Sequence, residues 1–161
     1  MLRCSRLSRG FTLIELMVVI AIIGVLATMA MPMVELARVR ADESELRTAL
    51  RQIRTALDDY RKAWDEGRIE KKVGASGYPP SLDVLVNGVK DVKQPNDVRI
   101  YFLRRIPRDP FHTDKNTPPE QTWGLRSYAS PPDEPMPGAD VFDVFSLSSR
   151  TGLNGIAYRN W

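Results

Sequence analysis

The carboxylate with the most unusual surroundings in this sequence is Glu15, which directly precedes the uncharged apolar run Leu16–Val34. A charge at the bilayer centre costs about 2.5 to 3.5 kcal/mol on insertion scales, and the cost falls when an opposite charge meets it. Cutting the chain between Gly10 and Phe11 would create an α-ammonium group close to this carboxylate. The sequence therefore predicts a processing site at Gly10 and Phe11.

A second group of carboxylates lies near the C-terminus, at Asp133, Glu134, Asp140 and Asp143. Calcium requires six to eight oxygen ligands with enough negative charge, and these four residues are the only acidic cluster in this part of the sequence that could supply them. A solvated acidic loop explains the same residues. We expect no cofactor and no metal, with calcium in this loop as the alternative.

Two further groups invite a chemical interpretation, but neither has the accompanying residues that the chemistry needs. His112 and Asp114 could form a general base pair, but no nucleophile motif accompanies them, and a loop histidine is the expected role. Arg104, Arg105 and Arg108 form a dense basic patch, for which we expect a solvated or subunit-contact role. We therefore predict no catalytic residue, no enzyme activity and no nucleic-acid partner.

The apolar run Leu16–Val34 is long enough for a helix to cross a hydrocarbon layer of ~30 Å. Arg3, Arg6 and Arg9 precede it and favour keeping that end in the cytoplasm, so the rest of the chain should lie on the other side. Without these three arginines, basic and acidic residues balance, so the overall charge of +3 does not indicate a nucleic-acid partner. The alternative is an ordinary signal peptide cut near Ala30, which would release a soluble binding domain or enzyme.

After the apolar run, hydrophobic residues recur three or four positions apart, which predicts an amphipathic helix. They are Leu46, Leu50, Ile53, Leu57, Tyr60 and Trp64. We expect one helix from Phe11 to about Glu66, about 80 Å long, with this stripe packed inside the chain. A coiled-coil dimer is the alternative. Pro32 can kink or melt the helix locally, and three ion pairs are expected on its surface: Glu43–Arg47, Asp58–Lys62 and Arg61–Asp65.

The second half of the chain is rich in proline and glycine and predicts short strands. Ser81 is expected to cap a short helix that Gly88 ends. The expected strands are Val98–Leu103, Trp123–Ala129, Asp140–Leu147 and Ile156–Tyr158. A small antiparallel sheet covering the helical stripe would give an α+β fold.

The segment from Arg9 to Glu15, followed by the apolar run, resembles the leader junction of type IV pilins and type II secretion pseudopilins. The resemblance implies that prepilin peptidase cuts after Gly10 and that Phe11 becomes N-methylated. It also implies that Glu15 sets subunit register during assembly. Pro32 matches the proline that often interrupts the helix in this family.

A second resemblance, to the major pseudopilin or G subunit of type II secretion, is carried by stretches of the second half. They are residues 78–86, 103–111, 123–124, 143–146 and 160–161. The chain departs from the pattern with an apparent insertion at residues 112–121 and a lengthened loop at 131–137. Residues 148–152 stand where many relatives carry an acidic calcium loop, and Arg150 there argues against the metal.

The resemblance implies four parts: a cleaved leader (1–10), a transmembrane half-helix (11–34), an amphipathic half-helix (35–66) and a globular periplasmic domain (67–161). It implies a single-pass inner-membrane subunit with its C-terminal domain in the periplasm. Such a subunit would join a filament of pseudopilins through an inner-membrane assembly platform, for protein secretion. A type IV pilus subunit is the alternative function.

Overall fold

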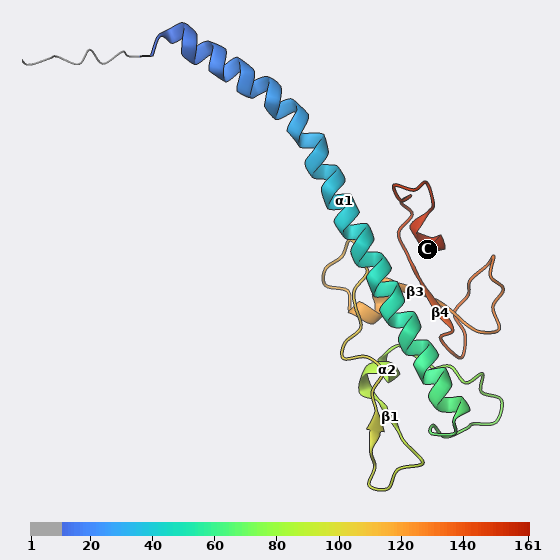
Figure 1. The fold of residues 1–161 in the computed structure, drawn as a ribbon. Helices are drawn as coiled ribbons and strands as arrows, with labels where there is room; N and C mark the ends of the chain where they lie inside the picture. The colour runs from blue at the N-terminus through green and yellow to red at the C-terminus, as the bar shows by residue number, and fades with distance from the viewer. Residues whose placement is uncertain (1–10) are drawn as a thin grey trace, which may run out of the picture. The chain divides into compact units, whose positions relative to one another are not determined.

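The computed structural model describes residues 11–161 and divides the chain into two units, which meet between Val39 and Arg40. Residues 1–10, including the predicted leader with Arg3, Arg6, Arg9 and Gly10, lie outside the described residues, as do the side chains of residues 29–32. The fold is α+β, as predicted, with a long helix α1 (Leu13–Asp65) and short antiparallel strands (Figure 1).

In the first unit, α1 carries no charged residue between Leu16 and Val34, and the described side chains of this stretch are exposed. Its most apolar 18-residue window has a mean hydropathy of 2.6 and is long and apolar enough to cross a membrane. The helix continues through Pro32, so the prediction of local melting there is wrong. The predicted kink at Pro32 stays a prediction.

In the second unit, one face of α1 forms the centre of the hydrophobic core, as the stripe predicted. Leu46 and Ile53 are 0% exposed, and Trp64 packs at the edge of the cluster. Residues of the same chain, among them Leu85 and Tyr158, cover this face. The coiled-coil alternative is therefore wrong, because the stripe is already buried within one chain.

The end of α1 follows from a glycine that adopts a left-handed conformation. Gly67 has φ of 68°, its N–H donates to the Trp64 carbonyl, and the Arg68 N–H donates to the Ala63 carbonyl. This pair of bonds is a Schellman motif, which satisfies carbonyls that the last helical turn leaves free.

The remaining elements are short, and residues such as Leu85, Trp123 and Val144 join them to the hydrophobic core. These elements are α2 (Asp83–Asn87), β1 (Val89–Lys90), β2 (Arg99–Ile100), the 3-10 turn Pro119–Thr122, β3 (Trp123–Arg126), β4 (Asp143–Ser146) and the 3-10 turn Tyr158–Asn160. β1 pairs with β2, and β3 pairs with β4, both antiparallel. The described residues thus form two separate pairs of strands in place of the single sheet that we expected.

The strands are shorter than predicted where the chain bends towards the core. The N–H groups of Phe102 and Leu103 both donate to the Leu85 carbonyl, which takes these residues out of the predicted strand Val98–Leu103. The predicted strand Ile156–Tyr158 is wrong. Only a bridge between Thr151 and Ala157 forms, and a 3-10 turn then buries Tyr158 completely.

The short helix α2 ends as predicted but begins differently. Gly88 has φ of 71° at the C-terminal cap, a conformation that favours glycine. Leu82 occupies the N-cap position, with no side-chain cap. The prediction that Ser81 caps this helix is therefore wrong.

Candidate functional site

The first turn of α1 holds Glu15 through its own neighbour, Thr12. The Thr12 backbone N–H and hydroxyl each donate to Glu15 Oε2 at 2.8 Å, and the Glu15 N–H donates to Thr12 Oγ1 at 3.3 Å. This reciprocal arrangement is a capping box, and the Thr-x-x-Glu spacing is its sequence signal. Sequence reasoning found Glu15 but missed Thr12.

The predicted cleavage site lies at the start of the described chain. Phe11 is 87% exposed and directly precedes the capping residue Thr12, whereas Gly10 lies outside the described residues. Phe11 therefore lies just before α1 and four residues before Glu15, which is in the first turn of the helix. The apolar side chains that follow, such as Leu16 and Ile20, are 57% and 61% exposed and need lipid or other helices as neighbours.

Buried carboxylates form a second set of functional candidates, which the sequence did not indicate. Glu43 is 6% exposed, and its Oε1 accepts hydrogen bonds from the Leu153 N–H at 2.7 Å and the Tyr158 hydroxyl at 3.2 Å. Burial and the nearby Glu43 carboxylate raise the pKa of Tyr158. These two hydrogen bonds link α1 to residues 153–158.

The predicted surface pair of Glu43 with Arg47 is wrong, because Glu43 faces the core. The Arg47 guanidinium instead lies 4.3 Å from the centre of the Trp161 ring. Of the three predicted pairs on α1, Arg61–Asp65 is the one that forms, at 3.1 Å.

Asp91 and Asp109 are each 1% exposed and organise the loops around the core. Arg68 Nη2 contacts Asp91 Oδ2 at 2.7 Å, and hydrogen bonds from this guanidinium lower the pKa of Asp91. Asp109 accepts hydrogen bonds from the Ser146 hydroxyl at 2.6 Å and the Phe111 N–H at 2.8 Å. Both carboxylates therefore stabilise the conformation of these loops.

The acidic residues considered for calcium are divided among different contacts. Asp143 accepts from Arg54 Nε at 2.8 Å, and Asp140 accepts from the Ser127 hydroxyl and the Tyr128 N–H, each at 2.8 Å. Residues 11–161 contain no group of three or more His, Cys, Asp or Glu side chains placed to hold a metal ion. At the position of the relatives' acidic loop, Arg150 lies 5.2 Å from the Phe111 ring centre. The residues present do not fit a calcium site.

The loop around His112 is held by polar contacts of its own. His112 Nε2 lies 3.2 Å from Thr117 Oγ1, and the Thr117 hydroxyl donates to Asp114 at 3.0 Å. Arg108 donates to the Thr117 carbonyl at 2.5 Å, whereas Arg104 and Arg105 are exposed. The structure therefore brings His112, Asp114 and Arg108 into one loop, and of the three arginines in the predicted basic patch it is Arg108 that bonds within this loop.

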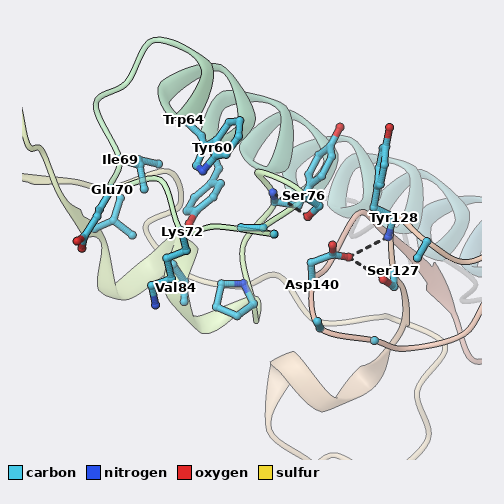
Figure 2. Close-up of a pocket in the computed structure, with 18 of the residues that line it drawn as sticks. Tyr60, Trp64, Ile69, Glu70, Lys72, Ser76, Val84, Ser127, Tyr128 and Asp140 are labelled. Atoms are coloured by element: carbon cyan, nitrogen blue, oxygen red, sulfur yellow. Dashed lines mark hydrogen bonds between the residues drawn. The ribbon is translucent and has the colours of Figure 1, made fainter.

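A groove of about 1190 Å³ opens between the end of α1 and the loops that follow it (Figure 2). The aromatic side chains of Tyr60, Trp64 and Tyr128 are among those that line it, and Asp140 contributes a carboxylate beside Tyr128. Among the described residues, those that line the groove include no histidine or cysteine.

Comparison with known proteins finds matches both to the N-terminal motif and to most of the chain. Residues 5–31 match the family described as "Prokaryotic N-terminal methylation motif". The chain is 34% identical over 111 residues to the Type II secretion system core protein G of Klebsiella pneumoniae, which covers 66% of this chain and 71% of that protein. The chain belongs to the type IV pilin-like and type II secretion pseudopilin family. No solved structure gives a significant match.

Other relatives of this pilin-like protein come from both branches of the family. It is 31% identical over 112 residues to the Type II secretion system core protein G of Dickeya chrysanthemi, covering 66% of this chain and 65% of the relative. It is 41% identical over 82 residues to the Type IV major fimbrial protein FimA of Dichelobacter nodosus, covering 47% and 51%. The chain therefore spans about two thirds of the first relative and about half of the second.

Proposed function

We propose that this pilin-like protein is a G-type pseudopilin, a structural subunit of a type II secretion pseudopilus. The observation that carries the proposal is the extent of the alignments. Core G proteins align over 66% to 82% of the chain. The pilins and fimbrial proteins align over 27% to 58% of it. Similarity to these G proteins thus extends over more of the chain than similarity to these pilins.

In this proposal, prepilin peptidase cuts after Gly10, and Phe11 becomes the N-methylated first residue. The exposed position of Phe11, directly before the first turn of α1, leaves its backbone accessible to both reactions. The precursor is held in the inner membrane by the apolar half of α1, with the globular part in the periplasm. An inner-membrane assembly platform then adds it to the filament.

Glu15 sets the axial register of the subunits by meeting the Phe11 α-ammonium of a neighbouring copy. Before assembly, Thr12 satisfies one oxygen of the Glu15 carboxylate through two donors at 2.8 Å. A carboxylate also has a second oxygen that can accept hydrogen bonds. The capping box therefore holds the side chain in place while leaving an acceptor for the incoming cation.

Lateral burial of the apolar half of α1 drives packing of the subunits, because its side chains are exposed in the single chain. Pro32 has no backbone N–H, so the carbonyl one turn earlier lacks its helical partner. We propose that α1 bends at this position when subunits pack. The function is assembly, and no catalytic role is proposed for His112 or any other residue.

A type IV pilus subunit is the second candidate, and a specific observation favours it. Identities with pilins are higher over shorter stretches, such as 49% over 53 residues with the Type IV major pilin protein PilA of Myxococcus xanthus. That match covers 31% of this chain and 24% of the relative.

The test combines the chemistry of the N-terminus with the phenotype of a deletion in the host. Mass spectrometry of the mature protein should give a chain that starts at N-methylated Phe11. Deleting the gene should stop export of enzymes across the outer membrane and leave surface pili intact. Loss of surface pili with normal export would instead support the pilus subunit, and a mature chain that starts near Met31 would refute both candidates.

A further inference from the structure

A basic pocket lies beside the last residues of the chain, separate from the aromatic groove. It has a volume of about 570 Å³ and is lined by Arg47, Arg51, Arg54, Asp58 and Trp161, among others. Three arginines on one face of α1, spaced three and four residues apart, give this pocket its positive character.

Two of these arginines have no acidic partner in the described part of the chain. Arg54 is engaged, because it contacts Asp143 at 2.8 Å and donates to the Trp161 carbonyl at 2.8 Å. Arg47 and Arg51 form no ion pair within residues 11–161. Stacking on Trp161 at 4.3 Å holds the Arg47 guanidinium in position, which lowers the entropy lost when it binds an anion.

An acidic loop on the same domain carries negative charge that complements the positive charge of this pocket. Asp133 and Glu134 are exposed, flanked by prolines on both sides, and form no ion pair within the described residues. The Ser130 hydroxyl closes the loop: it donates to the Glu134 carbonyl at 3.1 Å and accepts from the Met136 N–H at 2.9 Å. Fixed proline φ angles and this closure present the two carboxylates on a constrained backbone.

We propose that Asp133 and Glu134 of one copy dock into the pocket formed by Arg47, Arg51 and Trp161 of the next copy. The occupant is a second copy because the complementary charges lie on one chain, and neither Asp133 nor Glu134 lines the pocket that holds Arg47 and Arg51. An interface between two different surfaces of the same protein is heterologous, and repetition of it extends an open filament. The inference rests on the proposed filament function and adds a contact between globular domains to the packing of the apolar helices.

Asp58 sets the position of the acidic loop within the pocket. It is the pocket's own exposed carboxylate and lies seven residues after Arg51 along α1. Repulsion from Asp58 disfavours docking at that end and directs the incoming carboxylates towards Arg47 and Arg51. Because both partners are near the surface, the contact should weaken as the salt concentration rises.

Site-specific cross-linking of the full chain in cells tests the contact directly. The sequence contains one cysteine, Cys4, which lies in the predicted leader, so single cysteines can be introduced into the mature part. Cells would co-express an Arg51→Cys chain and a Glu134→Cys chain and be treated with a short bis-maleimide cross-linker. A linker is needed because the backbones of an ion pair lie further apart than a disulfide allows. The control replaces Glu134→Cys with Lys115→Cys, which lies in another exposed loop.

We expect a cross-linked dimer of Arg51→Cys and Glu134→Cys chains at a yield at least tenfold above the Lys115→Cys control. Independently, Arg51→Glu should lower the filament yield by about tenfold through like-charge repulsion, and adding Glu134→Arg in the same chain should restore it. Cross-linking at the control level, or cross-linking to a different pilin-like subunit in place of a second copy, overturns the contact.

Electron microscopy of filaments and the mass of the mature N-terminus report separately on the proposed function. Filaments built from N-methylated chains that cross-link only at the control level would support the proposed function and refute the docking contact. A cross-linked dimer without filaments or secretion would support the docking contact and refute the proposed function.

Discussion

Replacing Glu43 with alanine should destabilise the globular unit more than any other single change to a charged residue on α1. The substitution removes the acceptor of two donors, the Leu153 N–H at 2.7 Å and the Tyr158 hydroxyl at 3.2 Å. Each buried donor left without an acceptor costs about 1 to 3 kcal/mol. Tyr158 is 0% exposed and Glu43 is 6% exposed, so water reaches this site poorly. We expect a loss of about 3 kcal/mol in the free energy of unfolding.

The assay is urea unfolding of the full chain in a mild detergent, followed by tryptophan fluorescence. Trp161 packs edge-on against Tyr158, with ring centres 5.0 Å apart, so its emission reports on this part of the core. Glu45→Ala, at an exposed position on the same helix, is the matched control and should change stability by less than about 0.5 kcal/mol. Glu43→Gln keeps an acceptor oxygen and should lose about 1 kcal/mol.

A double-mutant cycle with Tyr158→Phe separates the hydrogen bond from other effects of the substitution. The two residues contact each other directly, so we expect a coupling energy of about 1 kcal/mol. A Glu43→Ala chain as stable as the Glu45→Ala control would refute the reasoning. Additive effects in the cycle would show that Glu43 stabilises the unit by some route other than Tyr158.

The remaining predictions concern the core, the pH dependence of stability and assembly. Ile53→Ala should lower the free energy of unfolding by about 2 to 5 kcal/mol in the same urea assay, because Ile53 is fully buried, whereas Gln52→Ala on the exposed face should change it little. Arg68 holds the pKa of Asp91 below its ordinary value of 3.8, so their pairing contributes stability above about pH 4 that is lost as the pH falls through the lowered pKa. The Asp91→Asn chain should therefore lose less stability in acid than the unaltered chain, and an identical acid profile would contradict this role. Glu15→Ala should leave cleavage and N-methylation intact by mass spectrometry but abolish filaments in electron micrographs, and normal filaments would refute the register mechanism.

The parts of the fold that the sequence predicted well are those with a regular period. The stripe through Leu46 and Ile53 repeats over several turns, so it fixed the buried face of α1 without knowledge of its partners. The glycine at the end of α2 was also predictable, because Gly88 adopts a positive φ that disfavours other residues. The N-terminal motif depends on contiguous residues and was equally accessible.

The parts that could not be predicted depend on contacts between distant residues. β1 contains two residues, too few to show an alternating pattern, and exists because Val89 lies opposite Ile100. Glu43 was interpreted as a surface residue because Arg47 stands four positions later, and its true partners, Leu153 and Tyr158, lie more than 100 residues away. Local spacing carries no information about such partners. Thr12 differs, because its distance from Glu15 is a recognisable capping signal that was overlooked.

The hydrogen bonds that Glu43 accepts from Leu153 and Tyr158 also determine when the globular unit can finish folding. Glu43 lies in one of the first turns of the globular unit, and both of its donors lie more than 100 residues further along the chain. Contacts of such long sequence separation form late in folding, after the cost of closing a large loop has been met. Until the segment with Leu153 and Tyr158 has been synthesised, the Glu43 carboxylate lacks these two donors, and the face of α1 that Tyr158 covers stays accessible to proteases and chaperones. A chain truncated before Leu153 should therefore be degraded faster than the full chain.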